Sequence, residues 1–352
     1  MDETRTDVSP SPRPIPGASL KGEGAATRRD RVVLIALGAL VLVVSVSRLW
    51  VGGWFGFGEL GRSVLELRAL ELGMGLTVGA SLAVGGTLLQ ALLRNPLASP
   101  YLLGVSSGAA LGMMFNQWLL YIGAVGSIYI MGNQVAAVIG AMTSLGIVYV
   151  LSQKRGTIDP LGLLLVGVIV NAVNGAAIMF INYLSPRGLR GDMALWMMGY
   201  LDANTGWWTL VLVMLLTLTA ICAAVWLGGA MDVATFSDAE AHSMGLNLHR
   251  LRLGVFSLAG LLTAGSVLLA GPIGFIGLIC PHLVRMLLGP RHRLLVIGSA
   301  MAGAALIVGA EVIIKLADIG QGKMPVGAIM AIIGGPLFLW MLRPQLGRGG
   351  DA

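Results

Sequence analysis

Hydrophobic residues in this chain occur in long blocks that are separated by short polar segments. The blocks cover roughly 31–50, 65–92, 99–116, 132–152, 160–184, 207–228, 249–270, 272–288, 293–316 and 325–342. A helix needs about 20 apolar residues to cross a bilayer core of about 30 Å, and a chain within lipid must satisfy its own backbone hydrogen bonds. The pattern therefore predicts an all-α polytopic membrane protein with about ten transmembrane helices.

Two of the blocks, 99–116 and 272–288, are short and are flanked or cut by proline. Short or broken helices are typical of transport proteins, where irregular backbone lines a cavity instead of facing lipid. Many of the 51 glycines also fall inside the blocks, among them Gly79, Gly85 and Gly86. Because small residues let membrane helices approach closely, these glycines indicate a tightly packed bundle.

The composition agrees with this class and excludes others. The chain is 56% hydrophobic and 11% charged, whereas soluble domains carry about 25% charged residues. The net charge of +6 comes from basic residues between the blocks, without the interleaved aromatics of a nucleic-acid surface. Cys222 and Cys280 both lie inside blocks, which favours two buried thiols over a disulfide.

The predicted organisation is a disordered cytosolic tail (1–30), a transmembrane domain (31–343) and a cytosolic C-terminal tail (344–352). Ten spans place both ends on one side. With the ends in the cytosol, thirteen basic residues fall in inner segments and seven in outer ones, as the positive-inside rule expects. The inner ones are Arg28, Arg29, Arg31, Arg94, Lys154, Arg155, Arg250, Arg252, Arg285, Arg291, Arg293, Arg343 and Arg348, and the outer ones are Arg48, Arg62, Arg68, Arg187, Arg190, Lys315 and Lys323.

The stretch QALLRNPLASP, residues 90–100, interrupts the apolar pattern with Gln90, Asn95, Pro96 and Pro100. Proline fixes its own backbone and moves the preceding residue away from helix. Asn95 and Ser99, each before a proline, are suitable capping residues. We expect one long helix to end here and a second, shorter one to begin.

Several stretches in order resemble the FecCD-type permease subunits of ABC importers for iron–siderophore complexes, haem and cobalamin. They are GGTLLQALLRNPLASPYLLGVSSGAALG (85–112), DPLGLLLVGVIVNAV (159–173), ALWMMGYLDANTGWW (194–208), GPIGFIGLICPHLVRMLLGPRHRLLVIGSAMAGAALIVGAE (271–311) and MPVGAIMAIIGGPLFLWMLR (324–343). The resemblance covers most of the chain from about residue 60. It implies the type II ABC importer permease fold in a bacterial inner membrane.

The same resemblance implies partners. A second permease copy would form a homodimer or paired half-dimer with the pathway along the subunit interface. Two ABC ATPase subunits would bind on the cytosolic side, and an extracytoplasmic substrate-binding protein would dock outside. The sequence lacks a GxxxxGK[ST] phosphate loop, so ATP-Mg is expected on the ATPase chains and no cofactor on this one. The chain is expected to be a transport subunit and not an enzyme.

The polar segment MDVATFSDAEAHSMGLNLHRLRLG, residues 231–254, predicts a short inner helix. Ser237 and Glu240 have the spacing of a capping box, so a helix should run from Asp238 to about Met244 and end at Gly245. The region 236–246 resembles the family's coupling helix, which contacts the ATPase. The resemblance assigns Ser237, Asp238, Ala241 and Gly245 to ATPase coupling, while the spacing alone favours an ordinary solvated loop helix.

Docking of a binding protein should depend on outer basic residues. The resemblance assigns this role to Arg68 and Lys315, and the family's second basic position in the Arg68 stretch is Glu71 here. Lys323 stands before PVG, where members of the family usually have a glutamate. These altered charges leave the docking geometry open.

Polar residues within spans are candidates for function. Asn171 and Asn174 lie in the fifth span, which lines the pathway in this family, although interhelical hydrogen bonding explains them equally. Glu311 is expected to pair with Lys315 at i+4 instead of relaying protons. The four histidines, His242, His249, His282 and His292, map near the cytosolic side, and no metal site is expected.

The function expected from this reading is ATP-driven import of a metal complex, with an iron complex favoured over haem or cobalamin. The alternative is an ion-coupled secondary transporter that works without ATPases. That alternative needs intramembrane carboxylates, for which only Glu71 and Glu311 are candidates. A membrane-embedded enzyme finds no support, because the sequence has no HExxH motif and no paired-carboxylate arrangement.

Overall fold

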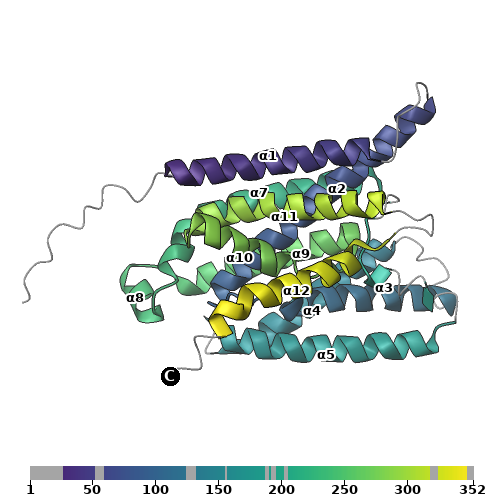
Figure 1. Ribbon diagram of the computed structural model, residues 1–352. Coiled ribbons are helices and arrows are strands. Elements are labelled where there is room, and N and C mark those ends of the chain that lie inside the picture. The colour runs from purple at the N-terminus through teal and green to yellow at the C-terminus, as the bar shows by residue number, and fades with distance from the viewer. Residues whose placement is uncertain are drawn as a thin grey trace, which may run out of the picture.

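A computed structural model describes residues 27–51, 59–123, 132–154, 157–186, 190–191, 196–201, 205–317 and 324–346. In this part of the chain ten helices correspond to the ten predicted blocks (Figure 1). They are α1 (Arg28–Trp50), α2 (Glu59–Leu92), α3 (Val105–Tyr121), α4 (Asn133–Leu151), α5 (Pro160–Leu184), α7 (Gly206–Val233), α9 (Leu248–Ala270), α10 (Ile276–Leu288), α11 (His292–Leu316) and α12 (Val326–Leu346). The all-α polytopic prediction is confirmed.

Seven of these helices, among the described residues, are long and apolar enough to cross a bilayer. The shorter ones include α3 and α10, which follow the proline-containing segments, as the sequence predicts. At about 1.5 Å per residue, the 13 residues of α10 span about 20 Å, less than a bilayer core. Two small features have no counterpart in the sequence prediction: the 3-10 turn η1 (Pro100–Leu103) and the hairpin of β1 (Gln153–Lys154) and β2 (Thr157–Ile158).

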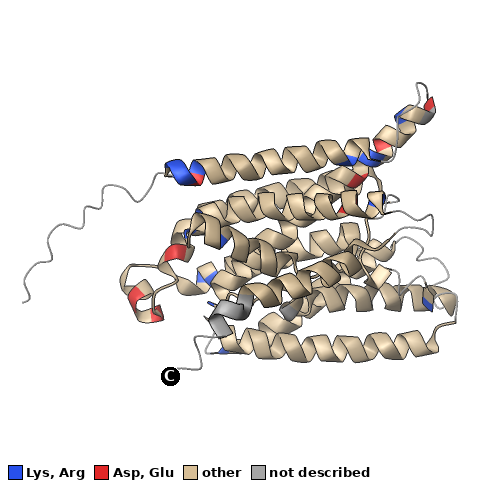
Figure 2. Ribbon diagram, viewed as in Figure 1, with Lys and Arg blue, Asp and Glu red and all other residues tan. Residues whose placement is uncertain are grey.

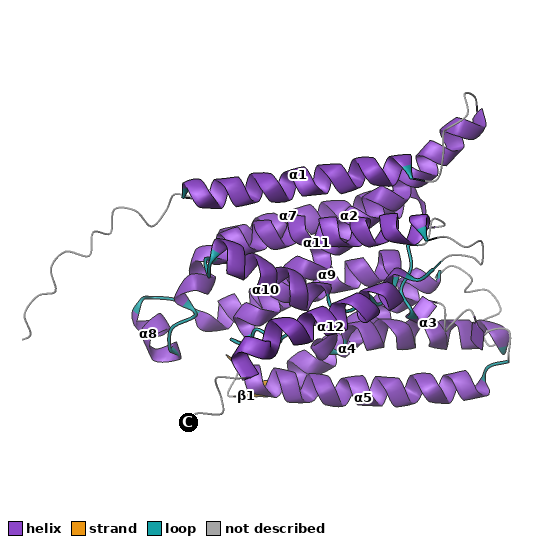
Figure 3. Cartoon of the chain, in the orientation of Figure 1, coloured by secondary structure: helices purple, strands orange, loops and turns teal. Residues whose placement is uncertain are grey.

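The helices form a layered bundle with α2 in its interior. In Figures 1 and 3, α1 lies along one side and α5 along the opposite side. Burial agrees with these positions: 78% of the most apolar stretch of α2 is buried, compared with 28% for α5 and 6% for α1. Helices α1 and α5 therefore present most of their apolar surface outward.

Glycines set the close crossings in the bundle interior. A Cβ on Gly79 would collide with the Gly303 carbonyl of α11, and one on Gly86 with the backbone of Gly277 in α10. Helices α3 and α4 meet in the same way at Gly108 and Gly140. Backbone contact of this kind gains van der Waals energy that larger side chains would prevent, which confirms the packing predicted from the glycine content.

Charged residues gather at the two ends of the bundle and leave the middle almost uncharged (Figure 2). One end carries the short helix α8 (Asp238–Ser243), and α1 begins and α12 ends at this same end (Figure 1). Both cysteines are free, and Cys280 is buried whereas Cys222 is exposed. Of the predicted tails 1–30 and 344–352, residues 1–26 and 347–352 lie outside the described residues. Helix α1 begins at Arg28 and α12 continues to Leu346, so both helices extend into the predicted tails.

Candidate functional site

The short helix at one end of the bundle forms as the sequence predicts. Helix α8 begins after the N-cap Ser237, whose side chain accepts a hydrogen bond from Glu240 N, while the Glu240 carboxylate accepts from Ser237 N at 3.0 Å. This reciprocal pair satisfies two donors that a helix N-terminus otherwise leaves open. Gly245 adopts φ +80°, a conformation that glycine takes at little cost, and so ends the helix.

Two arginines from other helices hold α8 by its first residue. The Asp238 carboxylate accepts hydrogen bonds from Arg94 Nη2 at 2.7 Å and from Arg252 Nη2 at 2.8 and 3.0 Å. Arg94 follows α2 and Arg252 lies in α9. Arg94 Nε also donates to the Ala234 carbonyl at 3.0 Å, at the end of α7. The end of α2 and the first part of α9 are thus joined to α8 at one carboxylate, and Arg94 also joins the end of α7.

Hydrogen bonds and neighbouring charges lower the pKa values of two acids in α8. Partial burial alone would raise the pKa of Asp238, but the hydrogen bonds and charges of Arg252 and Arg94 outweigh burial and hold it below its usual range. The Ser237 side-chain and backbone hydrogen bonds lower the pKa of Glu240. Both carboxylates are therefore ionised at neutral pH.

The residues assigned to ATPase coupling do not all face outward. Ala241 is the completely buried residue on the inner face of α8. Ser237 forms the N-cap, and Asp238 contacts the two arginines. The large apolar side chains that α8 and its flanks expose are Phe236 at 51% and Met244 at 59%. Sequence reasoning missed these two residues; their signal was an apolar side chain on each side of a short polar helix.

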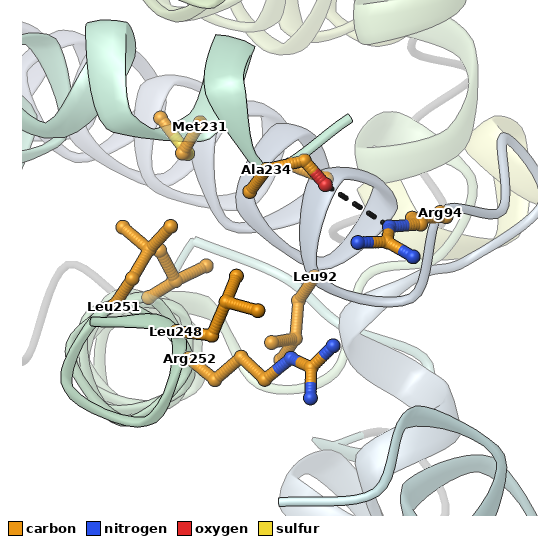
Figure 4. Close-up of a pocket in the computed structure, with 9 residues that line it drawn as sticks. Leu92, Arg94, Met231, Ala234, Leu248, Leu251 and Arg252 are labelled. Atoms are coloured by element: carbon orange, nitrogen blue, oxygen red, sulfur yellow. Dashed lines mark hydrogen bonds between the residues drawn. The ribbon is translucent and has the colours of Figure 1, made fainter. Parts of the chain in front are cut away.

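A small pocket lies beside the arginines (Figure 4). It is lined by Leu92, Arg94, Met231, Ala234 and Arg252, together with Ala91, Leu248, Leu251 and Val255. Figure 4 shows Arg94 donating to Ala234 on one side of the pocket and Arg252 extending from α9 on another. The helix ends that meet at Asp238 are thus not fully packed against one another.

The QALLRNPLASP stretch ends α2 as predicted. Arg94 adopts φ +47°, and Asn95 N donates back to the Gln90 carbonyl at 3.1 Å. Asn95 Oδ1 accepts from Leu97 N at 2.9 Å, which makes a local turn before Pro96 and Pro100 lead into η1. Gln90 Nε2 donates to the Gly277 carbonyl of α10 at 3.2 Å. Ser99 occupies the N-cap position of η1 but forms no capping hydrogen bond with its side chain.

The two asparagines of α5 form interhelical hydrogen bonds. Asn171 Nδ2 donates to the Tyr101 carbonyl of η1 at 2.6 Å, and its Oδ1 accepts from Ser107 Oγ of α3 at 2.6 Å. Asn174 Nδ2 donates to Ser107 Oγ and to Ser144 Oγ of α4, both at 3.0 Å. Of the two explanations that the sequence allows, this geometry favours interhelical bonding. It joins α5 to three neighbouring elements.

The opposite end of the bundle holds a buried charge cluster. Arg48 of α1 is 1% exposed and its Nη2 contacts the carboxylates of Glu71 in α2 and Glu311 in α11, the latter at 3.3 Å. Glu311 therefore makes its short contact with Arg48, and Lys315, its predicted partner, acts on it through charge without a salt bridge among the described residues. The arginine fork presents several donors and can serve two carboxylates at once. The sequence could not reveal this pairing, because Arg48 and Glu311 lie 263 positions apart.

The two docking candidates lie near this cluster. Arg68 is half-buried, and its Nη1 donates to the Leu49 carbonyl near the end of α1 at 2.8 Å. Lys315 is also half-buried. Glu71 is turned inward, so it is not part of the exposed surface. Lys323 lies outside the described residues.

The described part of the chain brings no three His, Cys, Asp or Glu residues together in a possible metal site. His292, one of the four histidines, contacts Asp232 at the end of α7 through Nδ1 at 2.7 Å and through its backbone N at 2.9 Å.

The fold is that of an all-α polytopic membrane protein. Residues 31–344 match the FecCD transport family, and the chain belongs to this family. It is 36% identical to the vitamin B12 import system permease protein BtuC of Vibrio cholerae, over 90% of this chain and 94% of that one. It is 35% identical to the hemin transport system permease protein HmuU of Yersinia pestis, over 80% and 83%.

A third relative is the Fe(3+)-citrate import system permease protein YfmD of Bacillus subtilis, at 34% identity over 80% of this chain and 81% of that one. Among solved structures, the fold matches an ABC transporter of the metal-chelate type in an inward-facing conformation. The TM-score is 0.77 at 26% identity, over 89% of this chain and 99% of that chain. The chain is thus a membrane transport component.

Proposed function

We propose that this chain is the membrane-spanning subunit of an ATP-driven importer of metal complexes, and that α8 is its contact with a separate ATPase. The observation that carries the proposal is the exposed, doubly capped helix at one end of the bundle, with Phe236 and Met244 exposed beside it. Exposed apolar side chains outside a membrane bundle are typical of a protein contact. ATP-Mg would be bound by the ATPase, and this chain would supply no catalytic residue.

The orientation follows from charge. The α8 end carries more basic residues than the opposite end in the described part of the chain, and the positive-inside rule assigns such an end to the cytosol. We therefore place α8 and both termini in the cytosol, with Arg48, Arg68 and Lys315 on the outer side. Arg68 and Lys315 would contact acidic residues of a binding protein there.

A second copy of the chain would pack against α5. Helix α5 exposes a row of large apolar side chains at the edge of the bundle, including Val168 at 48%, Val173 at 62% and Phe180 at 64%. In the homodimer that we propose, the pathway would run between the two copies. Asn171 and Asn174 would then fix the position of the pathway helix instead of binding the cargo.

The cargo that we propose is a metal chelate, with an iron chelate as the first choice. The relatives named above are permeases for vitamin B12, hemin and ferric citrate. Uptake of radiolabelled cyanocobalamin, hemin and ferric citrate into cells that express the complete transporter would separate these cargoes. Uptake of cyanocobalamin alone would overturn the iron assignment without affecting the transporter class.

The ATPase contact can be tested by purification of the tagged chain from native membranes in mild detergent. We expect a near-stoichiometric ABC ATPase to co-purify, and the double variant Phe236→Glu/Met244→Glu to lose it. Met324→Glu is the matched control, because Met324 is also exposed but lies at the opposite end of the bundle. Recovery of the chain alone, still moving solute without ATP, would favour a secondary transporter.

The contacts of Glu71 and Glu311 also argue against a secondary transporter. An ion-coupled mechanism needs carboxylates that are free to bind an ion or proton within the membrane. Both of these acids are engaged by Arg48, so neither offers an open ligand set.

A further inference from the structure

The stretch that breaks the apolar pattern lies between α8 and the helix that we assign to the pathway. Arg94 belongs to this stretch, contacts Asp238 of α8 and lies six positions before the first residue of η1. Turn η1 in turn contacts α5 through the hydrogen bond from Asn171 to Tyr101. A continuous set of short contacts therefore leads from the proposed ATPase contact to α5.

Arg94 is held in a conformation that its side chain alone would not favour. Its φ of +47° lies in the left-handed region, which residues other than glycine rarely adopt. Helices commonly end with glycine at this position. Here an arginine takes its place, and its guanidinium reaches both Asp238 and the Ala234 carbonyl. A glycine has no side chain to make these contacts, and they explain why an arginine stands at this strained position.

The segment from Arg94 to η1 is short and internally braced. Asn95 closes a turn on Leu97 through its side chain and accepts from Ala98 N through its carbonyl at 3.1 Å. Pro96 and Pro100 restrict the backbone, and Ala98 is completely buried. A displacement of Arg94 would therefore move η1 instead of being absorbed by a slack loop.

The far end of the segment is joined to α5 by buried polar contacts. Asn171 bridges η1 and α3, and Asn174 bridges α3 and α4. Within a membrane each of these groups would lack a partner if the helices separated. Movement of η1 would thus carry α5 with it.

The second arginine, Arg252, joins α8 to α9 and to the β-hairpin at the same end of the bundle. Arg252 lies in α9, contacts both Asp238 oxygens and reaches the Ile158 carbonyl of the β-hairpin at 3.4 Å. Its side chain is 14% exposed, compared with 40% for Arg94. Arg252 therefore forms the more enclosed contact and Arg94 the more open one, beside the small pocket of Figure 4.

We infer that Arg94 and Arg252 are positioning residues that hold the ATPase-contacting helix through Asp238, and that residues 94–103 transmit its displacement to α5. This inference rests on the proposed function. It adds a role for the QALLRNPLASP stretch, which links α8 mechanically to the pathway helix.

Hydrogen exchange of the purified permease–ATPase complex, with and without ATP and vanadate, tests the inference. In the unaltered complex we expect nucleotide to change exchange in 94–104 and in 165–180. In Arg94→Ala, ATPase co-purification and ATP hydrolysis should persist, while the nucleotide-dependent change in exchange in these segments should be largely lost. The double variant Arg94→Ala/Asp238→Ala should lose more than Arg94→Ala alone, because it also removes the contact of Arg252 with Asp238.

Arg250→Ala is the matched control, because Arg250 is an exposed arginine of α9 with no side-chain contact recorded in the described structure. Its exchange response should equal that of the unaltered complex. Arg94→Lys and Arg252→Lys provide second variants that keep the charge, and each should recover part of the response. An unchanged response in Arg94→Ala/Arg252→Ala, with ATPase bound, would overturn the inference. Failure of an ATPase to co-purify with the unaltered chain would instead overturn the proposed function.

Discussion

The two ends of the bundle carry charge clusters with opposite composition and opposite burial. At one end the single cation Arg48 joins Glu71 and Glu311, and its side chain is 1% exposed. At the other end the single anion Asp238 joins Arg94 and Arg252, and its side chain is 53% exposed. Each cluster connects three helices: α1, α2 and α11 in the first case, and α8, α9 and the end of α2 in the second.

The difference in burial implies a difference in role. Removing one partner from a buried ion pair leaves an uncompensated charge, and this is strongly destabilising. An exposed pair exchanges protein contacts for water at little cost. The Arg48 cluster is therefore suited to hold α1, which is otherwise poorly buried, on the bundle. The Asp238 cluster contributes less to stability and is suited to join α8 to α9 and to the end of α2.

The largest effect is expected from Arg48→Ala. This change leaves Glu71 and Glu311 buried without their cation, and we expect a loss of about 3–5 kcal/mol in stability. Thermal unfolding in detergent would measure it, with Arg62→Ala as an exposed control at the same end of the bundle. The triple variant Arg48→Met/Glu71→Gln/Glu311→Gln should regain most of the loss. Equal unfolding of Arg48→Ala and the unaltered protein would contradict the comparison.

A smaller, local effect is expected at the cap of α8. Ser237→Ala removes the side chain that accepts from Glu240 N and should destabilise α8 by about 1 kcal/mol. Hydrogen exchange in 238–246 would detect the change, whereas global unfolding should be unaffected. Ser237→Thr should retain the cap. Ser243→Ala, on the same helix, should leave exchange unchanged, since its hydroxyl only donates to the Glu240 carbonyl.

Arg94→Ala tests the other half of the comparison directly. Because the pair with Asp238 is largely exposed, we expect a loss in global stability below about 1 kcal/mol. The same unfolding measurement as for Arg48→Ala applies. A loss as large as that of Arg48→Ala would show that exposure does not distinguish the two clusters.

The smallest effect is expected from pH. A carboxylate whose pKa is lowered on folding adds stability above its ordinary pKa of about 4 and loses this contribution as the pH falls through the lowered value. The difference in melting temperature between the unaltered protein and Asp238→Asn should thus stay constant from about pH 8 to about pH 5. It should shrink in more acidic solution. A difference that disappears near neutral pH would contradict the arginine contacts.

The sequence by itself determined the class, the helices and the local signals. Ten apolar blocks predicted ten helices because lipid requires backbone hydrogen bonds to be closed within each span. The end of α2 at the QALLRNPLASP stretch and the capping box of α8 were also predictable, because proline geometry and capping depend on neighbours within a few residues. The similarity of several stretches in order indicated the family.

Only the tertiary structure decided which charged and polar groups meet. Arg48 contacts Glu311 across 263 positions, and Arg94 contacts Asp238 across 144. No periodicity in the chain specifies such pairs, since they depend on how helices rotate and cross. The glycine contacts of α2 with α11 and α10 set those crossings. They bring Glu71 inward to Arg48, and so an acid that the sequence places among the docking residues becomes part of the buried cluster instead.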